Sequence, residues 1–367
     1  MNIEYYLKLY DNRHNIKNEL YLFSNLSYTK TLNGVDSMSF NIPIGYLKDN
    51  EITIELCDHI ELYRIENNSE DLIWFGVVVN PTNSSINEMS IVCEGYFCLL
   101  FNTIFSTLYN DAMMHNNLSL LEKTYYDKTY SDLILQLVKD YSDKTKVIAG
   151  DNFDNVKLTT TRIIKWDDLL DEKITEFLEN SGLYFTIDKD RKFNIYSKIG
   201  EDKSEYYIIH DGNLINCSQA VIDYSAIKNR IYVFNQYTEE DSEGNSIDKY
   251  ITYVAEDKDS IASFGVKDCV LSVNDLRNIE TAEKYANKEL LKLSQPNINI
   301  TIKVVINDEL DIFDIEVGDY IYIESDLLNI NQKIRVLEYT ANIKENTVDI
   351  VLGNTIYRDN TVINYKY

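Results

Sequence analysis

The sequence is 367 residues long, which exceeds one ordinary hydrophobic core and leaves room for two to four domains. Hydrophobic residues make up 44 % of it, and only 3 prolines and 12 glycines occur, which excludes a disordered, collagen-like or linker-rich chain. The formal net charge of −25 argues against specific nucleic-acid binding, which would need a basic face.

The first hundred residues alternate between apolar and polar positions, which is the period of half-buried strands. Turn formers such as Asn33-Gly34 and Asn67-Asn68 separate the segments. This pattern is typical of a small all-β barrel or sandwich. The predicted strands are Ile3 to Tyr10, Ile52 to Leu56, Ile60 to Ile65, Ile73 to Val79 and Met89 to Cys93.

Two amphipathic helices follow this β region. Ser131 can cap the first, whose apolar face runs from Leu133 to Tyr141. The second carries apolar residues from Trp166 onward and stops at Ser181-Gly182. Two short strands come directly afterwards, so the region from about 105 to 204 predicts a compact α+β unit. These strands are Tyr184 to Ile187 and Phe193 to Tyr196.

The β pattern returns from Tyr206 onward. The polar, acidic stretch Glu239 to Asp248 predicts a loop, and a long helix is predicted over Asn274 to Leu293, with Pro296 ending it. The remaining predicted strands contain or span Ile208, Ile215 to Tyr224, Ile231 to Phe234, Ile298 to Val305, Tyr320 to Ile323, Ile334 to Tyr339 and Val348 to Leu352.

The two β regions are weakly similar to each other. Cys57 to Tyr63 aligns with Gly318 to Glu324, which places Asp58 on Asp319. At the same offset, Ile73 to Phe75 falls on Ile334 to Val336, and after a slip of two residues Asn87 to Cys93 falls on Asn346 to Leu352. Two readings remain open: a chance match between alternating strands, or two copies of one barrel-like domain. In the second reading a trimer would present six similar domains and could dock onto a sixfold ring.

Several short strings are spread over most of the chain in a fixed order. They are Leu32 to Pro43, Asp58-His59-Ile60, Trp74 to Val77, Ile91 to Tyr96, Tyr224 to Val233, Val317 to Ile321, Arg335 to Tyr339 and Val351 to Gly353. In these strings the chain resembles the baseplate or tail-hub proteins of long-tailed bacteriophages, including the hub part of tail-associated lysins. Seven positions in or beside these strings and the aligned segments are expected to be structural turn or repeat positions. They are Asn33, Gly34, Asp58, Gly76, Gly318, Asp319 and Gly353.

The resemblance implies a β-rich α+β, multidomain fold: two similar barrel-like tube domains, an α+β insertion and a smaller helix-containing insertion. The first tube domain would be 1–104, followed by an α+β peripheral domain at 105–204. The second tube domain would combine 205–237 with 296–354. A peripheral domain with the long helix would occupy 238–295, and 355–367 would be a C-terminal tail.

The resemblance also implies a function in the virion, at the tail tip. The chain would be a structural hub subunit whose homotrimer forms a pseudo-sixfold ring around the channel for DNA ejection. Its expected partners are itself, the distal tail protein or tail tube ring, the tape-measure protein, and spike, fibre or receptor-binding proteins. In many such proteins a peptidoglycan-cleaving domain follows the hub. About fourteen residues follow Gly353 here, so we expect any wall cleavage to reside in another protein.

The N-terminus and the cysteines indicate where the chain folds. The sequence begins without a basic-then-apolar signal, and no apolar run approaches the length of a membrane span, so we expect synthesis in the host cytoplasm and no membrane span. Five scattered cysteines favour buried free thiols. They are Cys57, Cys93, Cys98, Cys217 and Cys269.

No phosphate-binding, dinucleotide-binding, zinc-protease or serine-hydrolase motif occurs, so we expect no catalytic residue, no metal and no cofactor. Cys57 and His59 would share one face of a strand and could form a thiol–imidazole pair. The pair Cys93 and Cys98 could suggest half of a zinc site, but no second pair completes it, and the acids from Asp167 to Glu172 could imitate a glycosidase pair or calcium site. Two alternatives therefore stay open: a cell-wall-degrading tail enzyme (peptidoglycan hydrolase), and a receptor-binding adhesin whose exposed Tyr and Trp stack on host glycans.

Overall fold

The computed structural model of the chain describes residues 3–67, 69–154, 159–240, 245–273, 276, 278–306 and 314–354. Two compact units divide the chain: residues 1–216 with 302–351, and residues 217–301 with 352–367. Antiparallel strands dominate both, with helices between them, so the fold is β-rich α+β as the sequence predicted. The finer division at residues 104, 204, 237 and 295 stays a prediction.

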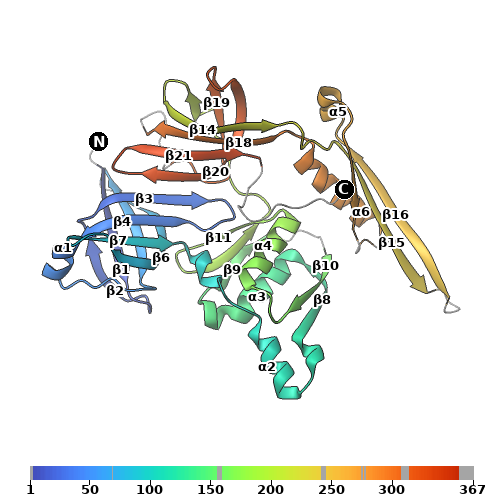
Figure 1. The fold of residues 1–367 in the computed structure, drawn as a ribbon, viewed down its shortest axis with the longest axis horizontal. Helices are drawn as coiled ribbons and strands as arrows, with labels where there is room; N and C mark the ends of the chain where they lie inside the picture. Colours follow the sequence, from blue (N-terminus) through green and yellow to red (C-terminus); the bar gives the residue numbers. More distant parts are fainter. Residues whose placement is uncertain are drawn as a thin grey trace. The chain divides into compact units, whose positions relative to one another are not determined.

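One sheet of 13 strands is the framework of the chain (Figure 1), in the order β14-β18-β21-β20-β3-β4-β7-β6-β5-β1-β2, with β19 on β20 and β13 on β19. The two β regions of the sequence meet in it, because β3 pairs with β20 from Thr31 opposite Glu338 to Ser27 opposite Asn342. The bounds are β1 Ile3–Tyr10, β2 Ile16–Leu20, β3 Ser24–Thr31, β4 Ser37–Pro43, β5 His59–Glu66, β6 Ser69–Asn83, β7 Glu88–Glu94, β13 Ile208–His210, β14 Leu214–Asp223, β18 Asn297–Val305, β19 Tyr320–Ser325, β20 Ile330–Asn342 and β21 Thr347–Gly353.

Alternating burial explains these strands. In β4 the side chains of Met38, Phe40 and Ile42 are buried and their neighbours are half-exposed. The period of two matches the pleat of a strand, so one face of β4 enters the core. The short helix α1 (Ile44–Asp49) follows Pro43, which is its N-cap residue and has an extended backbone.

The α+β part of the first unit has its own core. Helices α3 (Tyr130–Thr145) and α4 (Leu170–Ser181) pack against the small sheet β11-β12-β9 and bury residues such as Leu137, Phe177 and Phe193. Figure 1 shows these helices beside the sheet, with α2 projecting from the same part. The remaining bounds are η1 Tyr96–Leu100, α2 Ser106–His115, η2 Leu118–Leu121, β8 Glu122–Thr129, β9 Ile148–Phe153, β10 Thr159–Lys165, β11 Tyr184–Ile187 and β12 Lys192–Tyr196.

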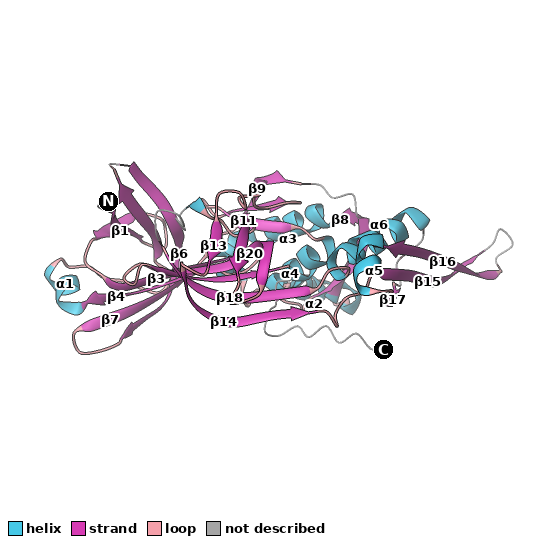
Figure 2. Cartoon of the chain, turned by 90° about the horizontal axis from the view of Figure 1, so that it is seen from above, coloured by secondary structure: helices cyan, strands magenta, loops and turns pink. Residues whose placement is uncertain are grey.

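The second unit is built on a three-stranded sheet in the order β16-β15-β17. Helix α6 lies against one face of this sheet (Figure 2). It buries Ala282 and Ala286 against Ile231 and Val233. The helix begins at Ile279 because the side chain of Asn278 accepts the amide hydrogen of Thr281 at 2.8 Å. The bounds are β15 Arg230–Glu240, β16 Ser246–Glu256, α5 Lys258–Phe264, β17 Asp268–Ser272 and α6 Ile279–Leu293.

Several local predictions were wrong, and the long helix begins at Ile279 rather than at the predicted Asn274. Ile52 to Leu56 is not a strand, although Ile52 and Ile54 are buried, because no strand pairs with this loop. Thr129, not Ser131, caps α3, and α4 begins at Leu170 rather than Trp166. Both ends of the acidic stretch predicted as a loop are strand instead, with Glu239 and Glu240 in β15 and Ser246 to Asp248 in β16, and residues 241–244 lie outside the described residues. Asn68, Asn274 and the predicted tail 355–367 lie outside them too.

Candidate functional site

A buried aspartate organises the turn that leads into β5. Asp58 is 2 % exposed, and its Oδ2 accepts the backbone amide of Glu55 at 2.8 Å and the ammonium of Lys17 at 2.8 Å. The amide of Asp58 donates back to the carbonyl of Glu55 at 3.2 Å. Cys57, between them, has a left-handed backbone with φ +66°. The carboxylate thus closes a tight turn and is neutralised by one lysine.

A second aspartate makes the same contacts before β19. Asp319 is also 2 % exposed, and its Oδ2 accepts the backbone amide of Glu316 at 2.9 Å and the ammonium of Lys203 at 2.8 Å. The amide of Asp319 donates to the carbonyl of Glu316 at 3.1 Å, and Gly318 has φ +99°. The second carboxyl oxygen of Asp319 also accepts the amide of Glu201 at 2.8 Å.

Each turn is then joined to the following hairpin strand by two backbone hydrogen bonds. The amide of Cys57 donates to the carbonyl of Val78 at 2.9 Å, and the amide of Val78 donates to the carbonyl of Asp58 at 2.8 Å. In the second turn Gly318, Val336 and Asp319 make the corresponding bonds, both at 2.8 Å. The two turns are therefore the same arrangement of acid, lysine and strand, built from residues far apart in sequence.

The strand register corrects part of the sequence alignment. Ile60 lies opposite Gly76, and Ile321 lies opposite Ile334, so Gly76 rather than Ile73 holds the position of Ile334. The offset changes by three residues because β5 and β6 pair over a longer stretch than β19 and β20, and the bulge at Leu62/Tyr63 is part of that difference. Gly353 is buried as the last residue of β21.

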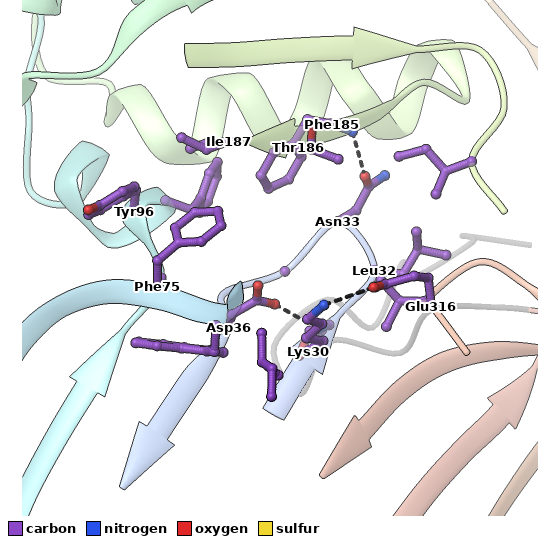
Figure 3. Close-up of a pocket in the computed structure, with 18 of the residues that line it drawn as sticks. Lys30, Leu32, Asn33, Asp36, Phe75, Tyr96, Phe185, Thr186, Ile187 and Glu316 are labelled. Atoms are coloured by element: carbon purple, nitrogen blue, oxygen red, sulfur yellow. Dashed lines mark hydrogen bonds and ion pairs between the residues drawn. The ribbon is translucent and has the colours of Figure 1, made fainter. Parts of the chain in front are cut away.

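Asn33 and Gly34 form the turn between β3 and β4. The Asn33 side chain donates to the carbonyl of Leu183 at 2.9 Å and accepts the amide of Phe185 at 3.0 Å, so it replaces a strand partner at the start of β11. Figure 3 shows Asn33 directed at the backbone of Phe185. A Cβ on Gly34 would lie 2.3 Å from the methyl carbon of Thr31, which explains the glycine. No sequence pattern indicated that Asn33 would contact Leu183 and Phe185, or that Gly34 would lie against Thr31.

A pocket of about 240 Å³ opens beside this turn (Figure 3). Its walls combine apolar rings with charged side chains at the rim. They include Lys30, Asn33, Phe75, Phe185, Ile187 and Glu316. The volume falls below the roughly 300–1,000 Å³ of typical small-molecule sites, so we assign no ligand to it.

The thiol–imidazole pair considered from the sequence does not form. Cys57 is exposed in its turn rather than on a strand, whereas His59 is 4 % exposed. The Nδ1 of His59 lies 3.2 Å from the hydroxyl of Tyr96, and its ring packs edge-on against His14. Burial, with His14 adding to it, lowers the pKa of His59 to about 4. Among the described residues no hydrogen bond joins Cys57 to His59.

The other candidate ligands are also dispersed. Within the described parts of the chain no group of three or more His, Cys, Asp or Glu could hold a metal ion, and all five cysteines are free. Cys93 is buried, and burial raises the pKa of its thiol. Asp171 and Glu172 lie in the first turn of α4, where acids suit the helix dipole. No helix in the described residues is long and apolar enough to cross a membrane.

Known proteins are similar to this chain in sequence over one part of it and in structure over most of its length. A family model described as prophage endopeptidase tail matches residues 202–358. The 43 kDa tail protein of prophage MuSo2 from Shewanella oneidensis has a TM-score of 0.62 at 10 % identity, covering 96 % of this chain and 98 % of that one. A tail protein from Neisseria meningitidis has a TM-score of 0.60 at 12 % identity, covering 95 % and 96 %.

A prophage tail protein from Listeria monocytogenes also shares the fold, with a TM-score of 0.57 at 17 % identity, covering 95 % of this chain and 94 % of that one. No curated protein matches the sequence. The chain has the fold of these phage tail proteins. The family match includes the second aspartate turn, around Asp319.

Proposed function

We propose that this chain is a phage tail protein and a non-catalytic hub subunit, three copies of which form a pseudo-sixfold ring at the tail tip. The pair of matching turns around Asp58 and Asp319 carries the proposal. Each turn introduces a hairpin that is followed by a strand of 7 residues, β7 or β21. Two similar barrel-like domains in each chain would give a trimer six of them, which joins a threefold tip to a sixfold tube.

In this proposal the tube domains are 1–104 and 205–237 with 296–354, and the peripheral domains are 105–204 and 238–295. The structural turn and repeat positions are Asn33, Gly34, Asp58, Gly76, Gly318, Asp319 and Gly353. The ring would contact the distal tail protein or tail tube on one side and a spike, fibre or receptor-binding protein on the other. Its acidic surface, at −25 per chain, would not adhere to DNA or impede its passage along the channel.

The mass of the purified chain in solution tests this function. Light scattering should give three times the 42.8 kDa of one chain, and cryo-electron microscopy of the assembly should show a threefold ring with six similar β-domains. A protein that stays monomeric at high micromolar concentration, and forms no ring in assembled particles, would overturn the proposal.

An endopeptidase is the second candidate, because the matched family model carries that word in its description. The separation of the exposed Cys57 from the buried His59 favours the non-catalytic reading. Zymography on purified cell-wall material decides between them: we expect no clearing. Clearing that is lost in Cys57→Ala or His59→Ala would establish the enzyme. The adhesin alternative stays a prediction.

A further inference from the structure

Asn33 and Gly34, in the turn between β3 and β4, are the single Asn-Gly step of the sequence. Asn33 has a left-handed backbone with φ +53°, a conformation that asparagine adopts more readily than most residues. A Cβ at position 34 would lie 2.3 Å from the methyl carbon of Thr31, so the turn also requires the glycine. The turn thus needs a pair of residues at which asparagine is chemically labile.

This lability comes from the neighbouring backbone nitrogen. The nitrogen of Gly34 attacks Cγ of the Asn33 side chain, the new C–N bond closes a succinimide ring, and the side-chain nitrogen leaves as ammonia with the proton from Gly34. Water then adds to the ring and opens it, which leaves aspartate or isoaspartate at position 33. Glycine favours the first step because it has no side chain that shields its nitrogen. The reaction consumes water and releases ammonia, and it needs no oxidant or reductant.

The folded turn holds both reacting groups in hydrogen bonds. The amide of Gly34 donates to the carbonyl of Thr31 at 3.3 Å, which keeps the proton on the attacking nitrogen. The Asn33 side chain donates to the carbonyl of Leu183 at 2.9 Å and accepts the amide of Phe185 at 3.0 Å, which keeps its Cγ beside β11. The ring can close only after these bonds break, so the reaction must wait for a local opening of the turn.

The surroundings of the turn admit water but disfavour the product. Asn33 and Gly34 are only half-buried, and both line the pocket of about 240 Å³. Asp36 and Glu316 line the same pocket (Figure 3), and its Lys30 already pairs with Glu316 at 3.0 Å. A carboxylate formed at position 33 would therefore meet two acids beside a lysine that is already engaged, and like charges at close range repel each other.

We propose that Asn33 is a deamidation site which its hydrogen bonds to β11 keep unreacted, and that the reaction, once it occurs, releases β11 from the turn. The product carboxylate can still accept the amide of Phe185, but it has no hydrogen to donate to the carbonyl of Leu183. That carbonyl then loses the donor that Asn33 supplied and faces a negative oxygen instead. Isoaspartate also lengthens the backbone of the turn. The change is permanent, so each opening that ends in reaction weakens this contact for good.

The rate of deamidation in the folded chain tests the protection. The full-length wild-type chain is incubated in mildly alkaline buffer, once folded and once in urea, and the peptide that contains Asn33 is followed by mass spectrometry. We expect the carboxamide to convert at least about tenfold more slowly in the folded chain, because two hydrogen bonds to β11 must break before the ring can close. Equal rates in the two samples would overturn the protection.

Two phenylalanine variants show whether the opening is local. Phe185→Leu weakens the attachment of β11, since the ring of Phe185 stacks on those of Phe97 and Phe193 with centres 4.6 and 5.1 Å apart. It should speed deamidation several-fold in the folded chain. Phe177→Leu changes a buried ring of the same core that contacts Tyr130 instead, and it should leave the rate at the wild-type value. Equal acceleration by both would mean that the whole core must unfold first, which would overturn the protection by β11. Circular dichroism checks that both variants keep the fold.

Asn33→Asp supplies the product directly and tests the release of β11. In hydrogen exchange at neutral pH, the amides of residues 184–187 should exchange at least about tenfold faster than in wild type, because a donor is lost and a charge is added. Asn12→Asp is the matched control, since it adds the same charge at an exposed position and should leave these amides unchanged. Wild-type exchange in Asn33→Asp, or equal acceleration in Asn12→Asp, would overturn the release. These results do not depend on whether the chain forms a trimer.

Discussion

Asp58 and Asp319 show how one residue fixes a turn in two places. Each buried carboxylate accepts a backbone amide within its own turn and a lysine ammonium from elsewhere in the chain. A buried charge is costly unless it is paired and hydrogen-bonded, and here both requirements are met. Removing the carboxylate leaves a turn amide and a partly buried lysine without their acceptor.

We therefore expect Asp58→Ala and Asp319→Ala each to lower the free energy of unfolding by about 3 kcal/mol. Urea denaturation followed by tryptophan fluorescence measures the change. Asp151→Ala is the matched control, because Asp151 also pairs with a lysine but its side chain is 87 % exposed. Equal effects of all three substitutions would contradict the role of burial.

Asp36 makes stability depend on pH. Burial raises the pKa of its carboxyl to about 6, with Glu316 and Glu338 adding to the effect and the amide of Thr31 opposing it. A folded-state pKa above the unfolded value means that the folded protein binds the proton more tightly. The stabilising contribution is then present below the unfolded pKa and is lost as pH rises through about 6.

Asp36→Asn removes this titration and keeps an oxygen that can accept the Thr31 amide, a bond of 2.8 Å. The variant should be more stable than wild type by about 2 kcal/mol at neutral pH, and the difference should shrink as pH falls toward 4. Chemical denaturation across this pH range measures it. A difference that does not change with pH would show that Asp36 is not the titrating group.

At the scale of elements, Arg335 joins three parts of the first unit. From β20 its guanidinium donates to the carbonyl of Gly318 at 2.9 Å, the carbonyl of Ile199 at 2.7 Å and the hydroxyl of Tyr184 in β11 at 2.6 Å. The backbone is close-packed here, since a Cβ on Gly200 would lie 2.1 Å from the Gly318 oxygen. One planar side chain thus holds the α+β part next to the second aspartate turn.

Arg335→Ala should lower the free energy of unfolding by about 3 kcal/mol, because three acceptors lose their donor together. Arg335→Lys should recover only part of the loss, since an ammonium cannot reproduce the planar fork of donors. Thermal unfolding of both variants measures the difference. Lysine that restored full stability would mean that charge alone matters at this position.

Alternation and turn residues were enough to predict many elements from the sequence. The strands Ile3–Tyr10 and Tyr184–Ile187 have the predicted bounds, and α4 ends at Ser181, where the sequence predicted its stop, with Gly182 after it at φ +68°. Ile52 to Leu56 failed because alternation cannot show whether a partner strand exists.

Local similarity placed Asp58 on Asp319, but it could not reveal their lysines. Lys17 lies 41 residues from Asp58, and Lys203 approaches Asp319 from a different segment with no matching sequence around it. The contacts of Asn33 with Leu183 and Phe185 were hidden for the same reason, because they join segments about 150 residues apart.

For the whole molecule, the net charge sets how self-association responds to salt. Copies of a −25 chain repel each other at long range, and added salt screens that repulsion. We therefore expect association to strengthen when salt is raised from about 10 mM to about 0.5 M, measured by sedimentation velocity. Weaker association at high salt would indicate an interface held by opposite charges instead of apolar contact.

The pairing of β3 with β20 also affects the order in which the chain folds. Thr29 and Thr340, whose hydroxyls lie 2.8 Å apart across these strands, are separated by 311 residues. Contacts this distant close late, because the entropy of a long loop must be overcome first. During synthesis the edge of β3 that pairs with β20 stays unpaired until β20 has been made. The α+β part, by contrast, can complete its core from residues 97–195. A growing chain therefore exposes one open edge of β3 until residues 330–342 have been made, and a chaperone or slow aggregation would act at that edge.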